Sequence, residues 1–313
     1  MSNRIEQMIA NRWEEDIQVS SHLNRNDHKY LYELLQRRGI EVLGETWRPN
    51  LVSPETFNDK INWCKLFDQQ KDQVDVVDKV KAFQYLLDRG LGRYNRVLLA
   101  SADSVAELNK GGVTGKCVFK CNHDSGSYRF FDMDQLTSED TFWKDINTQY
   151  APLLAREYGL RNAEWQYAMV NPRQILVERD LADGNGMPPD YKFHCTNGVV
   201  RWCQYIYDRK HGTKEINVLP DGTDTGVLFD TQFALGSDFT IPEDTWEEML
   251  KLASQLSKPY KYVRVDLYSV KGRIYFGELT FFPRGGYYPG VGQKTLGKLL
   301  EFDTSTVTKP VLF

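Results

Sequence analysis

Two acidic residues stand inside a largely apolar stretch, Val263–Gly286. Its first half alternates apolar and polar side chains, Lys271-Gly272 supplies a turn, and an apolar second half runs into Glu278, so the stretch is predicted to form a β-hairpin. Strand pairing then brings Asp266 of the first strand near Glu278 of the second. A charge among apolar residues is costly without a partner, and a divalent cation is one such partner. The alternative is an ordinary hairpin whose two carboxylates point to solvent.

The composition limits the class of protein. Of the 313 residues, 41% are hydrophobic and 26% are charged, as in a soluble globular protein with a substantial core. The net charge of -4 provides no basic field for nucleic acid. Five cysteines without a disulfide framework favour reduced, buried thiols and a cytoplasmic protein. No apolar signal core and no long apolar run occur, so neither secretion nor a membrane span is expected.

Periodicity predicts an α+β body with antiparallel strands, preceded by a helical extension. The early part of the chain lacks the glycine fingerprint of a dinucleotide-binding βαβ unit. Helical spacing occurs at 3–16, 27–38, 57–67, 76–88, 136–160 and 242–257. Strands are expected at 96–100, 116–120, 173–177, 190–195 and 199–207, with turns at 183–189 (DGNGMPP) and at Asn197-Gly198. The polar stretch 208–240 is expected to be a long loop with short strands.

A second informative stretch combines a strand with a polar loop. The strand at 116–120 delivers Lys120, and the loop Asn122–Ser127 follows directly. Backbone amides and hydroxyl groups of such a loop, together with a lysine, can hold phosphate oxygens. The residue order is not that of a Walker P-loop. The alternative is a hairpin turn with a surface lysine.

A third stretch, Ile175–Leu181, is an apolar strand that emerges into acidic residues. Its backbone and Glu178 can pair with the edge of an adenine ring, or the acid can simply mark a strand end. Asp190 and Lys192 follow after the next turn and share one face of their strand. They either contribute to a site or form a salt bridge on the sheet surface.

In their order along the chain, these residues resemble an ATP-grasp domain. Four blocks carry the resemblance and are similar to the TupA-like branch, which is associated with teichuronopeptide and surface-polysaccharide biosynthesis: PETFNDKINWCKLFD, VFKCNHDSGS, DYKFHCTNG and VRVDLYSVKGRIYFGELTFFP. The resemblance covers roughly 53–300 and implies two α+β subdomains with antiparallel sheets that grip ATP. We expect a helical region at 1–75 and an ATP-grasp domain at 76–313. Within that domain, a lid-type subdomain is expected near 110–180 and a metal-binding subdomain near 181–305.

The resemblance also implies which residues hold ATP. The phosphate-binding lysines of the family are matched by Lys79 and Lys120, and its ribose-binding acid is matched by Asp190. The loop that closes over the phosphates would consist of Asn122, His123, Ser125, Gly126 and Ser127. The hinge that binds adenine would consist of Glu178, Arg179 and Leu181. His123 has two readings, as a general base or as the donor of a structural hydrogen bond.

The magnesium carboxylates of the family are matched by Asp266 and Glu278. The third metal position is usually asparagine and is Thr280 here, a weaker neutral ligand that leaves the number of magnesium ions open. Lys192 stands where many members carry an arginine near the transferred phosphate. Arg264 shares the strand face of Asp266 and is expected to bind a carboxylate or acyl phosphate. Its alternative is a salt bridge to Glu278.

The acceptor side of the site is less well defined by the resemblance. Arg284, beside a pair of glycines, is a candidate for the acceptor's carboxylate. Substrate choice is expected in the divergent loop that begins at Asp208-Arg209. Helices replace the usual N-terminal α/β domain, so its contribution to the acceptor site cannot be transferred. Asp124 stands where the branch usually has glycine, and its charge would repel phosphate unless it binds metal or the acceptor amine.

The expected activity is that of an ATP- and Mg²⁺-dependent carboxylate–amine ligase that forms an amide through an acyl phosphate. Its substrates would be a small-molecule amine and carboxylate, such as an amino acid and a uronic acid of a surface glycan. The sequence is compatible with both a monomer and a homodimer. One alternative is a kinase that uses the same site to phosphorylate a sugar hydroxyl. Another is a glycosyltransferase-associated binding module with a degenerate site. Retention of Lys120, Asp266 and Glu278 argues against that module.

Overall fold

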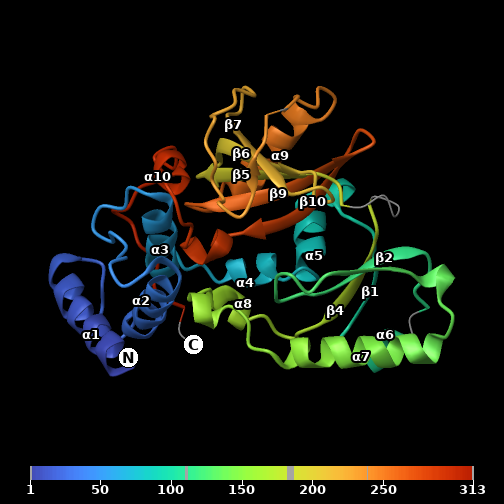
Figure 1. Cartoon of the computed structure of the whole chain (residues 1–313), viewed down its shortest axis with the longest axis horizontal. Coiled ribbons are helices and arrows are strands. Elements are labelled where there is room, and N and C mark those ends of the chain that lie inside the picture. Colours follow the sequence, from blue (N-terminus) through green and yellow to red (C-terminus); the bar gives the residue numbers. More distant parts are fainter. Residues whose placement is uncertain (1, 110–111, 182–186, 238, 312–313) are drawn as a thin grey trace.

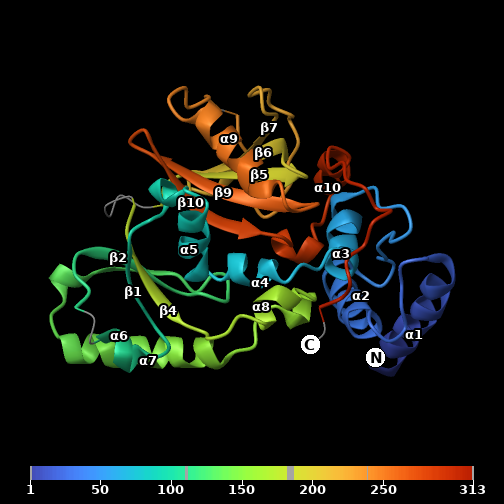
Figure 2. The ribbon, with the colours of Figure 1, turned by 180° about the vertical axis from the view of Figure 1, so that it is seen from behind.

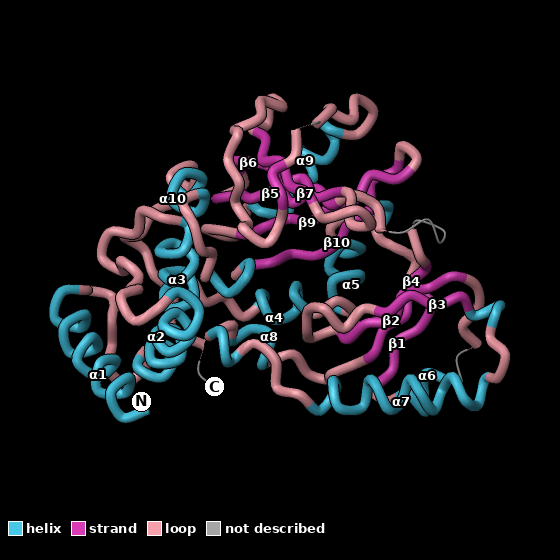
Figure 3. Tube along the Cα trace, in the orientation of Figure 1, coloured by secondary structure: helices cyan, strands magenta, loops and turns pink. Residues whose placement is uncertain are grey.

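The computed structural model describes residues 2–109, 112–181, 187–237 and 239–311. Figure 1 shows a group of helices at the N-terminal end, a small sheet backed by a long helix, and a larger sheet above them. Figure 2 shows the same arrangement from behind, and Figure 3 separates the helices from the strands. The small sheet and the large sheet together position the candidate site.

Three helices form the N-terminal part: α1 (Ser2–Val19), α2 (Lys29–Leu43) and α3 (Phe57–Phe67). α3 has the predicted bounds, whereas α1 extends beyond the expected 3–16 and α2 begins and ends later than the expected 27–38. The Thr56 hydroxyl accepts a hydrogen bond from the backbone N–H of Asp59, while the Asp59 carboxylate accepts one from the N–H of Thr56. This reciprocal cap fixes the start of α3, and α3 is buried along most of its length.

The prediction of a single helix at 76–88 is wrong, because the chain forms two helices there, α4 (Asp72–Val77) and α5 (Lys81–Asp88). Asp78 has an extended backbone, and its carboxylate accepts hydrogen bonds from the backbone N–H groups of Val80 and Lys81. A side chain that bonds local backbone in this way competes with the helical hydrogen bonds. The break leaves Lys79 between the two helices.

The small sheet has four antiparallel strands in the order β1-β4-β2-β3: β1 (Leu98–Ala102), β2 (Lys116–Cys121), β3 (Arg129–Asp132) and β4 (Ile175–Arg179). Two helices pack against it, α6 (Val105–Leu108) and α7 (Glu139–Ala155). α7 runs along the lower edge in Figure 1 and covers only the middle of the helix expected at 136–160. The sheet has its own apolar core around Phe119, Trp143 and Tyr150. The short helix α8 (Trp165–Ala168) precedes β4.

The large sheet has six strands in the order β10-β9-β5-β6-β7-β8: β5 (Asp190–Thr196), β6 (Val199–Tyr207), β7 (Lys214–Val218), β8 (Ala234–Leu235), β9 (Val263–Val270) and β10 (Arg273–Thr280). Only the β7–β8 pair is parallel among these strands. The turn at Asn197-Gly198 joins β5 to β6 as expected. α9 (Trp246–Ser257) packs on β5, β6 and β9 and begins later than the expected 242–257. The turn expected at 183–189 lies partly outside the described residues.

The hairpin predicted at 263–286 is confirmed as β9 and β10, joined at Lys271-Gly272. Glu278 pairs directly with Asp266, and the register shifts between Phe276 and Glu278. The shift is a bulge at Gly277, where an added Cβ would lie 2.8 Å from the backbone oxygen of Asp266. A bulge re-aims the side chains beside it, and here it sets Glu278 opposite Asp266.

One apolar core joins the N-terminal helices to the large sheet, with members from Trp13 in α1 to Val311. The chain returns from the large sheet through α10 (Gly292–Gly297), which packs against α3. All five cysteines are free and buried, as the sequence predicts. None of the helices in the described part of the chain has the length and apolarity of a membrane span.

Candidate active site between the two sheets

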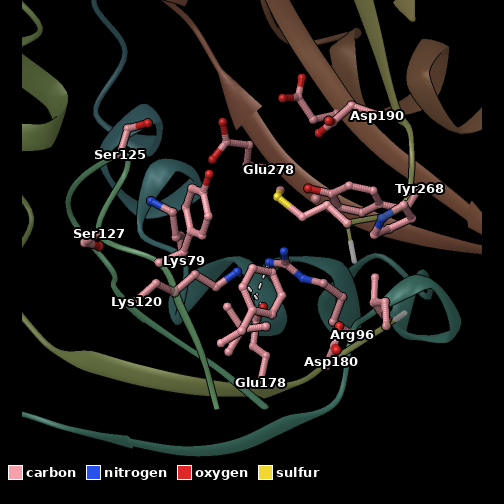
Figure 4. A pocket seen from close by; sticks show the side chains of 18 of the residues that line it. Lys79, Arg96, Lys120, Ser125, Ser127, Glu178, Asp180, Asp190, Tyr268 and Glu278 are labelled. Carbon is pink, nitrogen blue, oxygen red and sulfur yellow. Dashed lines mark ion pairs between the residues drawn. The ribbon is translucent and has the colours of Figure 1, made fainter. Parts of the chain in front are cut away.

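A cavity of about 290 Å³ lies between the small sheet and the large sheet. In Figure 4, Lys120, Glu178 and two loop serines approach it from the small sheet, while Asp190, Tyr268 and Glu278 approach it from the large sheet. Lys79 enters from the break between α4 and α5. The predicted site residues that line the cavity are Lys79, Lys120, Ser125, Gly126, Ser127, Glu178, Arg179, Leu181, Asp190, Lys192, Arg209, Asp266 and Glu278.

On the small-sheet side, the cavity is lined by Glu178 and the two cations that pair with it. One carboxylate oxygen lies 2.5 Å from Nζ of Lys120, and the other lies 2.9 Å from a terminal nitrogen of Arg96. Burial alone would raise the pKa of Glu178, but Arg96 and Lys120 hold it below its ordinary value. Burial and the neighbouring Arg96 lower the pKa of Lys120 to about 8. Each oxygen of Glu178 thus lies within ion-pair distance of a cation, but Oε1 has no hydrogen-bond partner among the described residues.

The lid loop is held by its own polar side chains. Asp124 is buried, accepts a hydrogen bond from the hydroxyl of Ser127 and pairs with Arg156 at 3.0 Å. The negative charge of Asp124 is therefore balanced by Arg156, which lies outside the loop. Lys79 donates from Nζ to the backbone carbonyl of Asp124, which ties the loop to the break between α4 and α5.

Two residues predicted in the lid loop do not line the cavity. The amide of Asn122 donates to the carbonyl of Pro172 and accepts from the N–H of Gln174. His123 is buried, with Nε2 3.3 Å from the carbonyl oxygen of Arg156, and burial lowers its pKa. Both residues hold the base of the loop in the structure.

Asp190 and Lys192 lie on one face of β5, as alternation predicts, with Nζ of Lys192 3.5 Å from the Asp190 carboxylate. Lys192 also lies 2.7 Å from Asp266 on β9. Arg209, from the loop after β6, donates to the second oxygen of Asp190. The predicted ribose acid is therefore enclosed by two cations. Its neighbour Asp208 pairs instead with His211 and Lys214.

The large-sheet wall carries the two predicted metal carboxylates. Arg264 donates from two nitrogens to Asp266, at 2.6 and 2.7 Å, and reaches Glu278 at 3.4 Å and the Thr280 hydroxyl at 3.0 Å. The Thr280 hydroxyl in turn donates to Glu278 at 2.9 Å. Arg264 is thus paired mainly with Asp266 rather than with Glu278. Neither Arg264 nor Thr280 lines the cavity.

Of the two carboxylates Asp266 and Glu278, Glu278 is the more exposed to solvent. Its side chain is 33% exposed, against 3% for Asp266. Burial would raise the pKa of Glu278, but Lys79, Arg264 and Lys192 lower it to about 2. Among the described residues, no group of three or more His, Cys, Asp and Glu side chains could hold a metal. A metal here would need further ligands from a bound molecule.

Arg284, the candidate for the acceptor, lies apart from the cavity lining and pairs with Asp230. Its backbone has a left-handed φ of 50°, which is unusual for a residue other than glycine. Asp230 is held in turn, since its N–H donates to the buried carboxylate of Glu215 on β7. The loop around 230 and the turn around 284 are therefore joined by this ion pair.

Sequence reasoning missed several residues of the cavity wall. Arg96 is the main one, because it precedes an apolar strand and the sequence carries no signal for its ion pair with Glu178. The remaining apolar and aromatic lining was likewise unassigned: Val118, Tyr128, Phe130, Met187 and Tyr268. An apolar lining with a few convergent charges is the usual form of a small-molecule site. The sequence hint for Val118 was strand alternation, which places it on the same face of β2 as Lys120.

Two mainly antiparallel sheets with their helices enclose a charged cavity, as the sequence predicts for an ATP-grasp domain. The pattern of the family described as TupA-like ATPgrasp matches residues 59–300. The chain belongs to this TupA-like ATP-grasp family. The match begins inside α3 and ends after α10, so it includes both sheets and every wall of the cavity.

The chain is also similar to solved ATP-grasp structures at low identity. One is D-alanine–D-alanine ligase from Bacillus anthracis complexed with ATP, at 15% identity and a TM-score of 0.40, covering 72% of this chain and 65% of that one. Another is L-amino acid ligase from Bacillus licheniformis, at 12% identity and a TM-score of 0.41, with 68% of this chain and 42% of that chain covered. A third is the ATP-grasp ligase PsnB complexed with minimal precursor, at 11% identity and a TM-score of 0.37, with 67% of this chain and 53% of that chain covered. The chain thus spans less than two thirds of each structure. No curated protein matches the chain.

Proposed function

We propose that the protein is an ATP-dependent carboxylate–amine ligase. The observation that carries the proposal is the pairing of two opposed walls across one cavity. Lys79 and Lys120 supply positive charge on one side, and Asp266 on β9 and Glu278 on β10 supply carboxylates on the other. Phosphoryl transfer requires this kind of positioning and charge neutralisation more than covalent help from the protein. Membership in the TupA-like ATP-grasp family supports ATP as the nucleotide.

The cationic residues would hold the phosphates. Lys120 is fixed by Glu178, and Lys79 lies against the lid loop, so both have defined positions before a nucleotide arrives. Lys192 lies between Asp190 and Asp266, next to the carboxylates, which suits contact with the migrating phosphoryl group. Ligands held in place before reaction lower the entropic cost of reaching the transition state.

The residues present fit magnesium that arrives with a nucleotide. Mg²⁺ is usually bound by one or two carboxylates and by substrate phosphates, and it rarely has an all-protein cage. The ionised, partly open Glu278 and the adjacent Asp266 would hold it, with Thr280 behind them. When bound, the ion would neutralise phosphate charge during transfer.

Arg264 would act next to the carboxylates. Its fork is buried beside Asp266 and reaches Thr280, so it presents a fixed positive charge at the wall where an acyl phosphate would form. In that reaction a carboxylate oxygen attacks the γ-phosphorus and ADP leaves. The amine then attacks the acyl carbon, phosphate leaves with one former carboxylate oxygen, and the amine loses a proton.

The finer substrate assignment is an amino acid as the amine and a uronic acid or related glycan carboxylate as its partner. The sequence resemblance to the TupA-like branch, which is associated with surface-polysaccharide biosynthesis, supports this pair. The Arg284–Asp230 pair, which offers a cation and an anion together, suits the two charged ends of an amino acid. Five free, buried cysteines favour a reducing compartment such as the cytoplasm.

The test is the release of ADP and of free phosphate across a panel of uronic acids crossed with amino acids. A ligase releases both products in equal amounts, and only when the carboxylate and the amine are present together. A kinase releases ADP and leaves the phosphate on the sugar. Release of ADP without free phosphate would therefore replace the ligase proposal with the kinase alternative.

A further inference from the structure

Arg96 is a buried cation in the cavity that the proposed chemistry does not use. It precedes β1, its side chain is 10% exposed, and it points toward Lys120 and Glu178 in Figure 4. Its Nε is buried and has no hydrogen-bond partner among the residues that the structure describes. A buried donor without a partner is destabilising. Retaining such a group in the wall of a ligand cavity requires a compensating role.

The geometry of Glu178 indicates that role. The carboxylate lies between two cations, with Oε1 2.9 Å from a terminal nitrogen of Arg96 and Oε2 2.5 Å from Nζ of Lys120. Among the described residues Oε1 has no hydrogen-bond partner, so Arg96 acts on Glu178 as an ion-pair partner, and its charge acts on the carboxylate that pairs with Lys120. Two cations on one anion also leave the cavity floor with a net positive charge, which suits a phosphate ligand.

We propose that Arg96 is a positioning residue of the nucleotide pocket. Through the carboxylate that it shares with Lys120, it holds Lys120 in place and sets the upper pH limit of nucleotide binding. This inference rests on the proposed function, because it requires a phosphate-bearing ligand in the cavity.

The charged groups that face Lys120 explain why the limit should depend on Arg96. They are Glu178 on β4, Arg96 before β1 and Lys79 between α4 and α5. The wider wall adds Asp180, Asp190, Lys192, Tyr268 and Glu278. Burial and Arg96 favour loss of the Lys120 proton, while Glu178 opposes it. Removing Arg96 should therefore keep Lys120 charged to higher pH, and removing the carboxylate should do the opposite.

The experiment measures ATP affinity from pH 7 to 9.5 in the full-length protein. Because the terminal phosphate of a nucleotide is ionised above a pKa of about 6, only protein groups titrate in this range. Wild-type affinity should fall about tenfold per pH unit once Lys120 loses its proton. Arg96→Met should bind less tightly at pH 7 and begin its decline at least half a pH unit higher. Glu178→Gln should begin its decline at lower pH.

Two further variants complete the design. Lys120→Arg keeps its charge throughout this range, so its affinity should stay nearly flat. Arg93→Met is the matched control, because it removes an exposed arginine outside the cavity with the same change in net charge. Its pH profile should follow that of the wild type.

The outcomes separate this inference from the proposed function. A wild-type protein that fails to bind ATP at any pH contradicts the function itself. ATP binding with the same onset of decline in Arg96→Met and the wild type contradicts the role of Arg96, since a merely structural arginine would weaken binding equally at every pH. Should Arg96→Met fail to fold, the onset in Glu178→Gln decides alone, and an unchanged onset there overturns the inference.

Discussion

The buried carboxylate of Asp124 is balanced by neighbouring side chains. A carboxylate in a loop that is proposed to bind phosphate is unfavourable by charge alone. Here its side chain is buried and held by Arg156 and Ser127, so the loop keeps its shape without presenting a free negative charge. The charge of Asp124 therefore depends on a partner outside the loop.

Arg156→Met should weaken ATP binding. The carboxylate of Asp124 would lose its balancing charge, and one unpaired charge near phosphates should reduce affinity about tenfold, or about 1.4 kcal/mol. Arg161→Met removes a more exposed arginine and is the control. The double variant Asp124→Asn with Arg156→Met should regain affinity, because the charge is then absent. Equal affinities for wild type and Arg156→Met would show that Asp124 does not affect the nucleotide.

The contribution of Glu278 to the free energy of unfolding should decrease as the pH falls. Nearby cations lower its pKa in the folded protein to about 2 from an ordinary value of 4.5. A lowered pKa means that the ionised side chain stabilises the fold above the ordinary value and that this contribution disappears as the pH falls toward the folded value. The free-energy difference between wild type and Glu278→Gln, from urea unfolding, should therefore shrink between pH 5 and pH 3. A constant difference would contradict the ion pairing.

At the scale of elements, α3 is tied to the turn that follows β10. The amide of Asn58 donates to the carbonyl of Tyr288 and accepts from its N–H, at 2.9 and 3.0 Å. One helical turn further, Asn62 donates to the carbonyl of Gly286, and the buried ammonium of Lys65 donates to Gly285. These three side chains share one face of α3. A helix of the N-terminal part therefore shapes the turn that carries the acceptor candidate.

Asn58→Ala should lower the free energy of unfolding by about 3 kcal/mol, because it leaves a buried backbone donor and a buried acceptor unsatisfied. Asn11→Ala is the control, since its side chain accepts a hydrogen bond from Gln7 on an exposed face of α1 and should change stability by less than about 0.5 kcal/mol. The measurement is equilibrium denaturation in urea. Similar losses in the two variants would indicate that α3 and the turn are not coupled.

The elements predicted from sequence are those whose signal is local. Alternation and a turn dipeptide located both strands of the hairpin, and Asn197-Gly198 located the turn between β5 and β6. The break at Asp78 was missed because apolar spacing continues through it, while the competing hydrogen bonds of its carboxylate leave no mark in the periodicity. Likewise the bulge at Gly277, which orients Glu278, depends on how two strands pair.

At the scale of the molecule, the site exists only because separate cores face one another. The small sheet has its own apolar core, and the large sheet shares a core with the N-terminal helices. The family motifs identified the strand residues on both sides, so Lys120, Asp266 and Glu278 could be predicted. The Arg96–Glu178 pair and the enclosure of Asp190 by Arg209 link residues distant in sequence, so no local pattern revealed them.

The central claim is that the cavity transfers a phosphoryl group from ATP to a carboxylate. The most direct measurement uses the carboxylate that gives the greatest phosphate release in the panel, labelled with ¹⁸O in its carboxyl group, together with its amine. Released phosphate should carry one ¹⁸O atom per turnover, detected by mass spectrometry, and Glu278→Gln should abolish the release. Unlabelled phosphate, or phosphate retained on the sugar product, would contradict the claim.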